Sequence, residues 1–206
     1  MKACERLHAV RHLYALMRCP ICHAKASTSL GCCQACAHEL FQVKRSSGLI
    51  TLGTYNGKLE RAIKAMKFYG ATRLAKLFAE HLQKEVRKAG WQGTICPVPL
   101  HWTRLALRGY NQAALIAKPL AHQLSYPYHK CLSRKKRTQQ QAKLSRQARL
   151  GNVEDAFVAK ELSGKTFILV DDVITSGATT EACKQTLLKA GAASVKCVCV
   201  ARAVYA

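Results

Sequence analysis

The sequence lacks any run of 18 apolar residues, so no segment is expected to cross a membrane as a helix. The amino-terminal stretch does not read as a secretory signal, because Arg6, His8, Arg11 and His12 interrupt its apolar core. Eleven cysteines, an odd number, without an export signal favour metal ligation in a reducing compartment over disulfides. We therefore expect a cytoplasmic location, peripheral to the inner membrane at most through partner proteins.

Acidic residues are scarce, and the middle of the chain has none. The 206 residues include 33 Lys or Arg and only 11 Asp or Glu, which gives a formal net charge of +22. Residues 86–153 carry 13 basic side chains and no acidic one, whereas residues 154–206 carry six of each. Sixty-eight consecutive residues without an acid argue against the alternative of a generally basic surface, and they predict a polyanionic partner larger than one small substrate.

The chain is organised around residues 166–180, TFILVDDVITSGATT. Residues 166–170 predict a short buried strand, and residues 178–188 predict a helix. A strand–loop–helix unit presents free backbone N–H groups and a helix N-terminus at the carboxyl end of a sheet, where phosphates bind. The predicted phosphate ligands are Thr175, Ser176, Gly177, Ala178 and Thr179.

Two acids, Asp171 and Asp172, end the predicted strand. Their carboxylates can accept from sugar hydroxyls or hold a divalent cation. The alternative, a helix N-cap beside two solvated acids, accounts for the hydroxyls but not for the acid pair with glycine. The stretch resembles the PRPP-binding signature of type I phosphoribosyltransferases. The resemblance implies that the acids hold the ribose hydroxyls, that the turn holds the 5′-phosphate, and that Mg²⁺ accompanies PRPP.

Two C-x₂-C knuckles near the amino terminus predict a structural zinc site. The expected ligands are Cys19, Cys22, Cys33 and Cys36, because four thiolates close a tetrahedral shell and leave no open position. Cys32 is an alternative to Cys33 through C-x₃-C spacing. His23 and His38 are nearby alternative ligands, although four-cysteine ligation is simpler. Free buried thiols are the remaining interpretation.

Strands alternating with helices predict an α/β fold, a mostly parallel sheet covered by helices. We expect a zinc module over residues 1–47 and a main domain over residues 48–206. Outside the central stretch, helices are predicted at residues 3–17, 57–68, 71–89 and 113–124, and strands at residues 49–55, 93–98, 126–132, 154–158 and 194–200. Cys96, Cys183, Cys197 and Cys199 are predicted core thiols.

A predicted loop after the strand at residues 93–98 carries Arg104 and Arg108. Arginine forks suit phosphate oxygens, so this loop is a second candidate phosphate site, expected to face the pyrophosphate of PRPP. The alternative for either arginine alone is an ordinary surface charge.

Several motifs together resemble the ComF (ComFC) family of competence proteins. They are the cysteine knuckles, Tyr55, residues 67–70 (KFYG), 97–99 (PVP) and 108–112 (RGYNQ), Arg137, Thr138, Gln141, Leu144, Arg149, Asn152, and the PRPP loop. Tyr110 replaces the more usual Phe, and Ser176 the more usual Thr. The resemblance implies a zinc module joined to a phosphoribosyltransferase-like domain, and a part in natural transformation with single-stranded DNA and DNA-uptake proteins as partners.

A cationic stretch at residues 133–141 cannot bury itself. By the same resemblance it takes the place of the catalytic hood loop of phosphoribosyltransferases. The predicted DNA contacts are Arg134, Lys135, Lys136, Arg137, Lys143, Arg146 and Arg149. Candidate stacking faces for unpaired bases are Trp91, Trp102, Tyr110, Tyr126 and Tyr128, each of which could equally be a core residue.

Three functions remain open from the sequence. The first is single-stranded DNA binding during uptake, which the cationic middle and the family resemblance favour. The second is an active phosphoribosyltransferase of nucleotide metabolism; every PRPP-holding part is present, but no acceptor pocket can be read. The third is an adaptor that recruits a partner through the zinc module.

Overall fold

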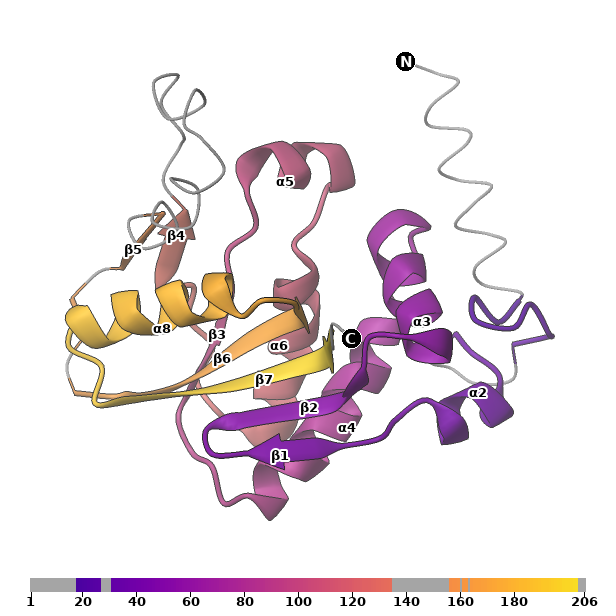
Figure 1. Ribbon diagram of the computed structural model, residues 1–206, viewed down its shortest axis with the longest axis horizontal. Helices are drawn as coiled ribbons and strands as arrows, with labels where there is room; N and C mark the ends of the chain where they lie inside the picture. Colours follow the sequence, from indigo (N-terminus) through magenta and orange to yellow (C-terminus); the bar gives the residue numbers. More distant parts are fainter. Residues whose placement is uncertain (1–17, 27–30, 135–155, 160, 163, 204–206) are drawn as a thin grey trace.

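Figure 1 shows a computed structural model of the chain, which describes residues 18–26, 31–134, 156–159, 161–162 and 164–203. The helix predicted at residues 3–17 and most of the cationic stretch lie outside the described residues. Within them, no helix is long and apolar enough to cross a membrane.

The centre of the molecule is a five-stranded sheet with the order β1-β2-β7-β6-β3. The parallel strands are β2 (Leu49–Thr54), β7 (Ser194–Arg202), β6 (Thr166–Ile174) and β3 (Thr94–Pro97). Only the short edge strand β1 (Lys44–Ser46) runs antiparallel, next to β2. The predicted mostly parallel sheet is confirmed.

Helices cover the sheet unequally on its two faces. On one face, α4 (Leu74–Lys88) contacts β2 and β7, and α6 (Gln112–Leu124) contacts β3 and β6. On the other face, α8 (Ala178–Lys189) packs over β6 and β7, and Figure 1 shows no helix in front of β1 and β2 on that side. The remaining long helix, α3 (Gly57–Phe68), contacts α4.

The helices form where apolar residues recur at helical spacing. In α4, four residues at helical spacing are fully or almost fully buried: Leu74, Leu77, Phe78 and Leu82. The predicted core thiols Cys96, Cys183, Cys197 and Cys199 are also buried. Burial on both faces of β7 explains why alternation along that strand is weak.

Three predicted elements differ from the structure. The strand ending at the acids continues through them to Ile174, because β6 keeps pairing with β7, where Asp171 lies opposite Cys199. The loop carrying the two arginines contains a helix, α5 (Trp102–Arg108), which His101 caps at one end and Gly109, at φ 76°, ends at the other.

The strand predicted at residues 126–132 is reduced to a single bridge, between Tyr128 and Ile95. A strand does begin at Leu132: β4 (Leu132–Arg134) pairs antiparallel with β5 (Phe157–Ala159) in a separate small sheet.

The cysteine-rich segment packs onto the main core. Cys19, Ile21, Cys36 and Leu40 belong to the buried cluster that also contains the residues between α4 and the sheet. A short helix, α2 (Gln34–Glu39), begins within the second knuckle, with Cys33 as its N-cap, and the ion pair of Glu39 with Lys58 links it to α3.

Candidate functional site

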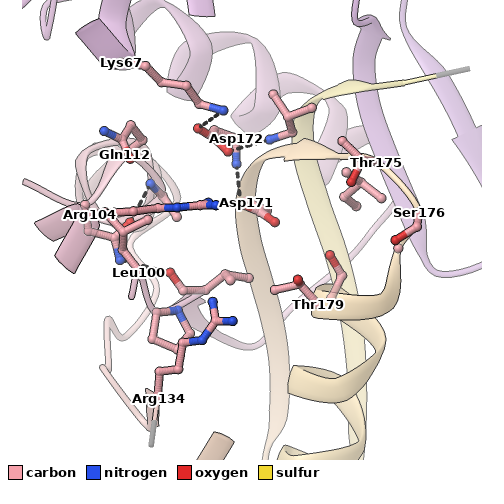
Figure 2. A pocket seen from close by; sticks show the side chains of 18 of the residues that line it. Lys67, Leu100, Arg104, Gln112, Arg134, Asp171, Asp172, Thr175, Ser176 and Thr179 are labelled. Carbon is pink, nitrogen blue, oxygen red and sulfur yellow. Dashed lines mark hydrogen bonds and ion pairs between the residues drawn. The ribbon is translucent and has the colours of Figure 1, made fainter. Parts of the chain in front are cut away.

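The central cavity lies where the carboxyl ends of β3 and β6 meet, and it has a volume of about 280 Å³. Both acids of the central stretch line it, together with four of the five predicted phosphate ligands, Thr175, Ser176, Gly177 and Thr179. Arg104 and Arg108 line the same cavity. Figure 2 shows Arg104 pointing across the cavity toward Asp171. The structure therefore brings together the two phosphate sites that the sequence suggested separately.

The two acids are held by their own backbone. Asp171 Oδ1 accepts from the N–H of Asp172 at 2.8 Å, and Asp172 Oδ1 accepts from the N–H of Val173 at 2.7 Å. Lys67 Nζ, at the end of α3, lies 2.9 Å from Asp172 Oδ2. Burial and the neighbouring charge of Asp172 raise the pKa of Asp171 well above its usual range, and the charge of Lys67 only partly opposes this.

This environment favours a bound cation or hydroxyl donor at the acids. A buried carboxylate next to a second one is stabilised by either. Carboxylate oxygens beside a phosphate cradle are the hard donors that Mg²⁺ prefers, so the residues present fit Mg²⁺ held together with a phosphosugar.

The turn before α8, residues 175–179, can offer backbone donors to an anion, and we call it the phosphate turn. Gly177 adopts φ 82° and precedes the first turn of the helix without any side-chain cap. Among the hydroxyls, only Ser176 reaches a backbone donor of this turn, with Oγ 3.4 Å from the N–H of Ala178. Because the first N–H groups of a helix have no partner within it, this end of α8 can receive phosphate oxygens.

Two residues that the sequence reasoning did not assign to this pocket complete its far wall. Gln112 is 2% exposed; its Oε1 accepts from Arg108 at 3.2 Å, and its Nε2 has no hydrogen-bond partner among the described residues. A buried amide N–H group on a cavity wall can donate to an acceptor atom of a bound ligand. Arg134, predicted to contact DNA, also lines this cavity, with its guanidinium carbon 5.4 Å from the ring centroid of Phe157. The sequence pointed to both only through the family resemblance, since Gln112 ends the 108–112 motif and Arg134 lies in the stretch that resembles the hood loop. Their convergence on this cavity follows from the fold.

The other predicted DNA contacts, Lys135, Lys136, Arg137, Lys143, Arg146 and Arg149, lie outside the described residues.

The cysteine knuckles converge as predicted. The sulfurs of Cys19, Cys22, Cys33 and Cys36 all lie within 4.8 Å of one another. A tetrahedral zinc–thiolate site with Zn–S of about 2.3 Å needs sulfurs roughly 3.8 Å apart, so this donor set fits zinc. Cys32, the alternative, is fully buried and is not part of the cluster.

Hydrogen bonds within the knuckles shape the cluster. The N–H of His23 donates to the carbonyl of Cys19 at 2.9 Å, and His23 takes φ 64°, which closes the first knuckle. Burial raises the pKa of Cys19, but backbone hydrogen bonds from the two knuckles outweigh it and bring the pKa down to about 7. The backbone thus favours the thiolate at Cys19, whereas burial and the neighbouring cysteines raise the pKa of Cys36.

The five candidate stacking residues have different environments. Trp91, Tyr126 and Tyr128 pack against the core, and Tyr110 donates a hydrogen bond to the carbonyl of Met66. Trp102 is 57% exposed. Two residues not considered for stacking, Phe68 and Tyr69, are similarly exposed at the end of α3.

Residues 111–204 match the sequence model of the phosphoribosyl transferase domain, which includes β6, the phosphate turn and α8. The fold is that of the type I phosphoribosyltransferases. A purine phosphoribosyltransferase from Pyrococcus horikoshii aligns over 61% of this chain and 70% of that chain, at 20% identity and a TM-score of 0.38, too distant a likeness to bear on the substrate.

Curated relatives define the family more narrowly. The chain is 32% identical over 202 residues to DNA utilization protein YhgH of Salmonella typhimurium, covering 94% of this chain and 87% of the relative. It is 33% identical to competence protein F of Haemophilus influenzae (82% and 79% covered) and 30% identical to competence protein ComFC of Streptococcus pneumoniae (86% and 77% covered). The chain belongs to this ComF family of competence and DNA utilization proteins, as its motifs predicted.

Proposed function

We propose that the protein binds single-stranded DNA during DNA uptake and natural transformation, using a phosphoribosyltransferase fold whose central pocket holds a phosphosugar. The names of its relatives, competence protein and DNA utilization protein, support the process. The excess of basic residues supports a polyanionic partner. DNA-uptake proteins are the expected further partners.

The observation that carries the proposal is a set of exposed aromatic side chains at the end of α3 and on α5, the two helices that bring Lys67, Arg104 and Arg108 to the central cavity. Phe68, Tyr69 and Trp102 are each more than half exposed. Arg108, which lines the pocket, has its guanidinium carbon 4.9 Å from the ring centroid of Phe68. Aromatic faces next to arginines suit unpaired bases and phosphates, because every base can stack and every phosphate can pair with a cation.

Binding of a labelled thymidine 20-mer, followed by fluorescence anisotropy, tests the proposal. We expect affinity to fall steeply with salt, and each of Phe68→Ala, Tyr69→Ala and Trp102→Ala to weaken it by about tenfold, since one stacked base contributes about 1–3 kcal/mol. Leu107→Ala is the matched control, because Leu107 is 84% exposed on α5 but has no ring. No binding at low salt would contradict the proposal.

A second function, active phosphoribosyl transfer, is favoured by one specific observation. The pocket combines two acids, a phosphate turn, three arginines and the unsatisfied amide of Gln112. The chemistry needs mainly positioning and stabilisation of the departing pyrophosphate, for which such a site suffices. The test is whether the protein releases pyrophosphate from PRPP when it is given candidate acceptors, the bases and amines of nucleotide metabolism.

A structural zinc ion in the four-cysteine cluster is part of the proposal. Its four thiolates would close the coordination shell, so the metal would hold residues 18–26 and 31–40 against the main core and leave no catalytic position. Mg²⁺ would accompany the phosphosugar at Asp171 and Asp172. The clustered thiols and the thiols in the core also support a reducing, cytoplasmic location.

A further inference from the structure

A second, larger cavity adjoins the phosphate turn from the opposite side. It has a volume of about 580 Å³ and lies over the part of the sheet that Figure 1 shows without a helix in front, at β1 and β2. Leu49, Thr51 and Gly53 of β2 line it, since Ile50 and Leu52 face the core on the other side. We call this cavity the β1–β2 groove.

Thr175 and Ser176 line both the central pocket and the β1–β2 groove. A phosphate bound at this turn therefore has open space on two sides. A pocket closed beyond the phosphate accepts only a monoester, the terminal phosphate of a small sugar. Space on both sides accommodates a phosphodiester, in which a second ester oxygen links the phosphate to the next nucleotide.

The charge of the groove suits that continuation. Lys44 and Arg202 line it, both are exposed, and neither side chain has an ion pair within the described part of the chain. Arg45, the third cation, is already paired with Glu85. None of the described residues lining the groove is acidic.

The strand register spaces the two cations along one path. Arg202 lies opposite Ile174 on one side and Thr54 on the other, so it stands beside the start of the phosphate turn. Lys44 lies opposite Thr51 on the outermost strand. Three strand spacings separate β1 from β6, so the path is roughly 14 Å across, longer than one phosphosugar.

We propose that the phosphate turn binds a phosphodiester within a DNA strand, and that the strand continues from the central pocket through the β1–β2 groove, with its backbone phosphates on Arg202 and Lys44. This inference rests on the proposed single-stranded DNA binding. It assigns the phosphosugar pocket and the DNA site to one continuous surface that shares Thr175 and Ser176.

The test compares the binding of DNA and of ribose 5-phosphate to a variant of the groove and to a control variant. The double variant Lys44→Gln, Arg202→Gln should bind a fluorescein-labelled thymidine 20-mer about five- to tenfold more weakly at low salt. Its log–log salt slope should be flatter by about 1.4, at roughly 0.7 per lost phosphate contact. Its affinity for ribose 5-phosphate, measured by calorimetry, should be unchanged. Lys84→Gln, Lys118→Gln is the matched control, because both lysines are exposed on α4 and α6 and those helices cover the opposite face of the sheet.

Competition provides the second measurement. Ribose 5-phosphate should displace the 20-mer from the wild-type protein, because both ligands need the phosphate turn. Simultaneous, independent binding would overturn the inference, as would equal DNA affinity in the groove and control variants. A parallel loss of ribose 5-phosphate affinity would also overturn it, by placing the two cations in the phosphosugar site. Failure of the wild-type protein to bind the 20-mer at all would instead refute the proposed function.

Discussion

Replacing Lys67 by methionine tests how the pocket tolerates two adjacent acids. The ammonium group of Lys67 lies 2.9 Å from Asp172, and the side chains are 16% and 12% exposed. Methionine keeps most of the apolar length and removes the charge. The carboxyl groups of Asp171 and Asp172 would then face each other without a neighbouring cation from α3.

The expected cost follows from the burial of the pair. Removing one partner of a buried ion pair costs about 3–5 kcal/mol. Because both side chains keep some exposure, we expect the free energy of unfolding at neutral pH to fall by about 2–3 kcal/mol. For a chain of this length, that corresponds to a melting temperature lower by about 5–10 °C.

The stability lost in Lys67→Met should be larger at neutral pH than at acidic pH. The charge of Lys67 lowers the pKa of Asp171, so removing it raises that pKa further. Between the unfolded and the folded pKa, the folded state then binds more protons than the unfolded state, and stability falls as pH rises through this window. The deficit should therefore shrink toward acidic pH, where the carboxyl groups are protonated in both states.

Thermal unfolding between pH 5 and pH 8 measures the effect. Lys64→Met is the control on the same helix, because the Lys64–Glu60 pair is half exposed and should contribute less than about 1 kcal/mol. Adding Asp172→Asn to Lys67→Met should restore part of the stability. Equal melting temperatures of the Lys67→Met and Lys64→Met variants at every pH would show that Lys67 does not neutralise the two acids.

Further predictions concern the metal, the sugar and one thiol. Purified protein should contain one zinc per chain by elemental analysis, and Cys22→Ser should lose both zinc and soluble yield; clearly substoichiometric metal without chelator would contradict this. Asp171→Asn, Asp172→Asn should abolish calorimetric binding of ribose 5-phosphate while the fold remains, and unchanged affinity would refute the assignment. A hydrogen bond with Cys96 lowers the pKa of Cys131 to about 7 despite partial burial, so its alkylation rate should rise through pH 7 and then level off. Cys96→Ala should shift that midpoint upward, and a wild-type rate still climbing at pH 9 would count against the pair.

The elements that the sequence predicted well are those with a repeating apolar pattern. The helix at residues 57–68 has the same bounds in the structure, because Leu59, Ile63 and Met66 recur at helical spacing and are all buried. Helix α5 escaped prediction because it buries none of its residues. Strand β1 escaped because its three exposed residues show no alternation.

The candidate site was only partly predictable for a different reason. The acids and the phosphate turn are contiguous in the chain, so local pattern sufficed. Lys67, Gln112 and Arg134 reach the pocket from three other elements, and their convergence depends on the strand order and on β4. The grouping of Cys33 rather than Cys32 depends on which sulfur faces the first knuckle, which spacing alone leaves open.

Because α5 is exposed, it should open locally while the rest of the protein stays folded. Seven residues are too few for a helix to persist alone, and α5 has no buried side chain to anchor it. Its amide hydrogens should therefore exchange with solvent by local opening, at a free energy far below that of global unfolding. Since α5 carries Arg104 and Arg108, a phosphate that holds them would slow this exchange without any change in the sheet. The protection of the hydrogen-bonded amides of α5 would then report occupancy of the pocket.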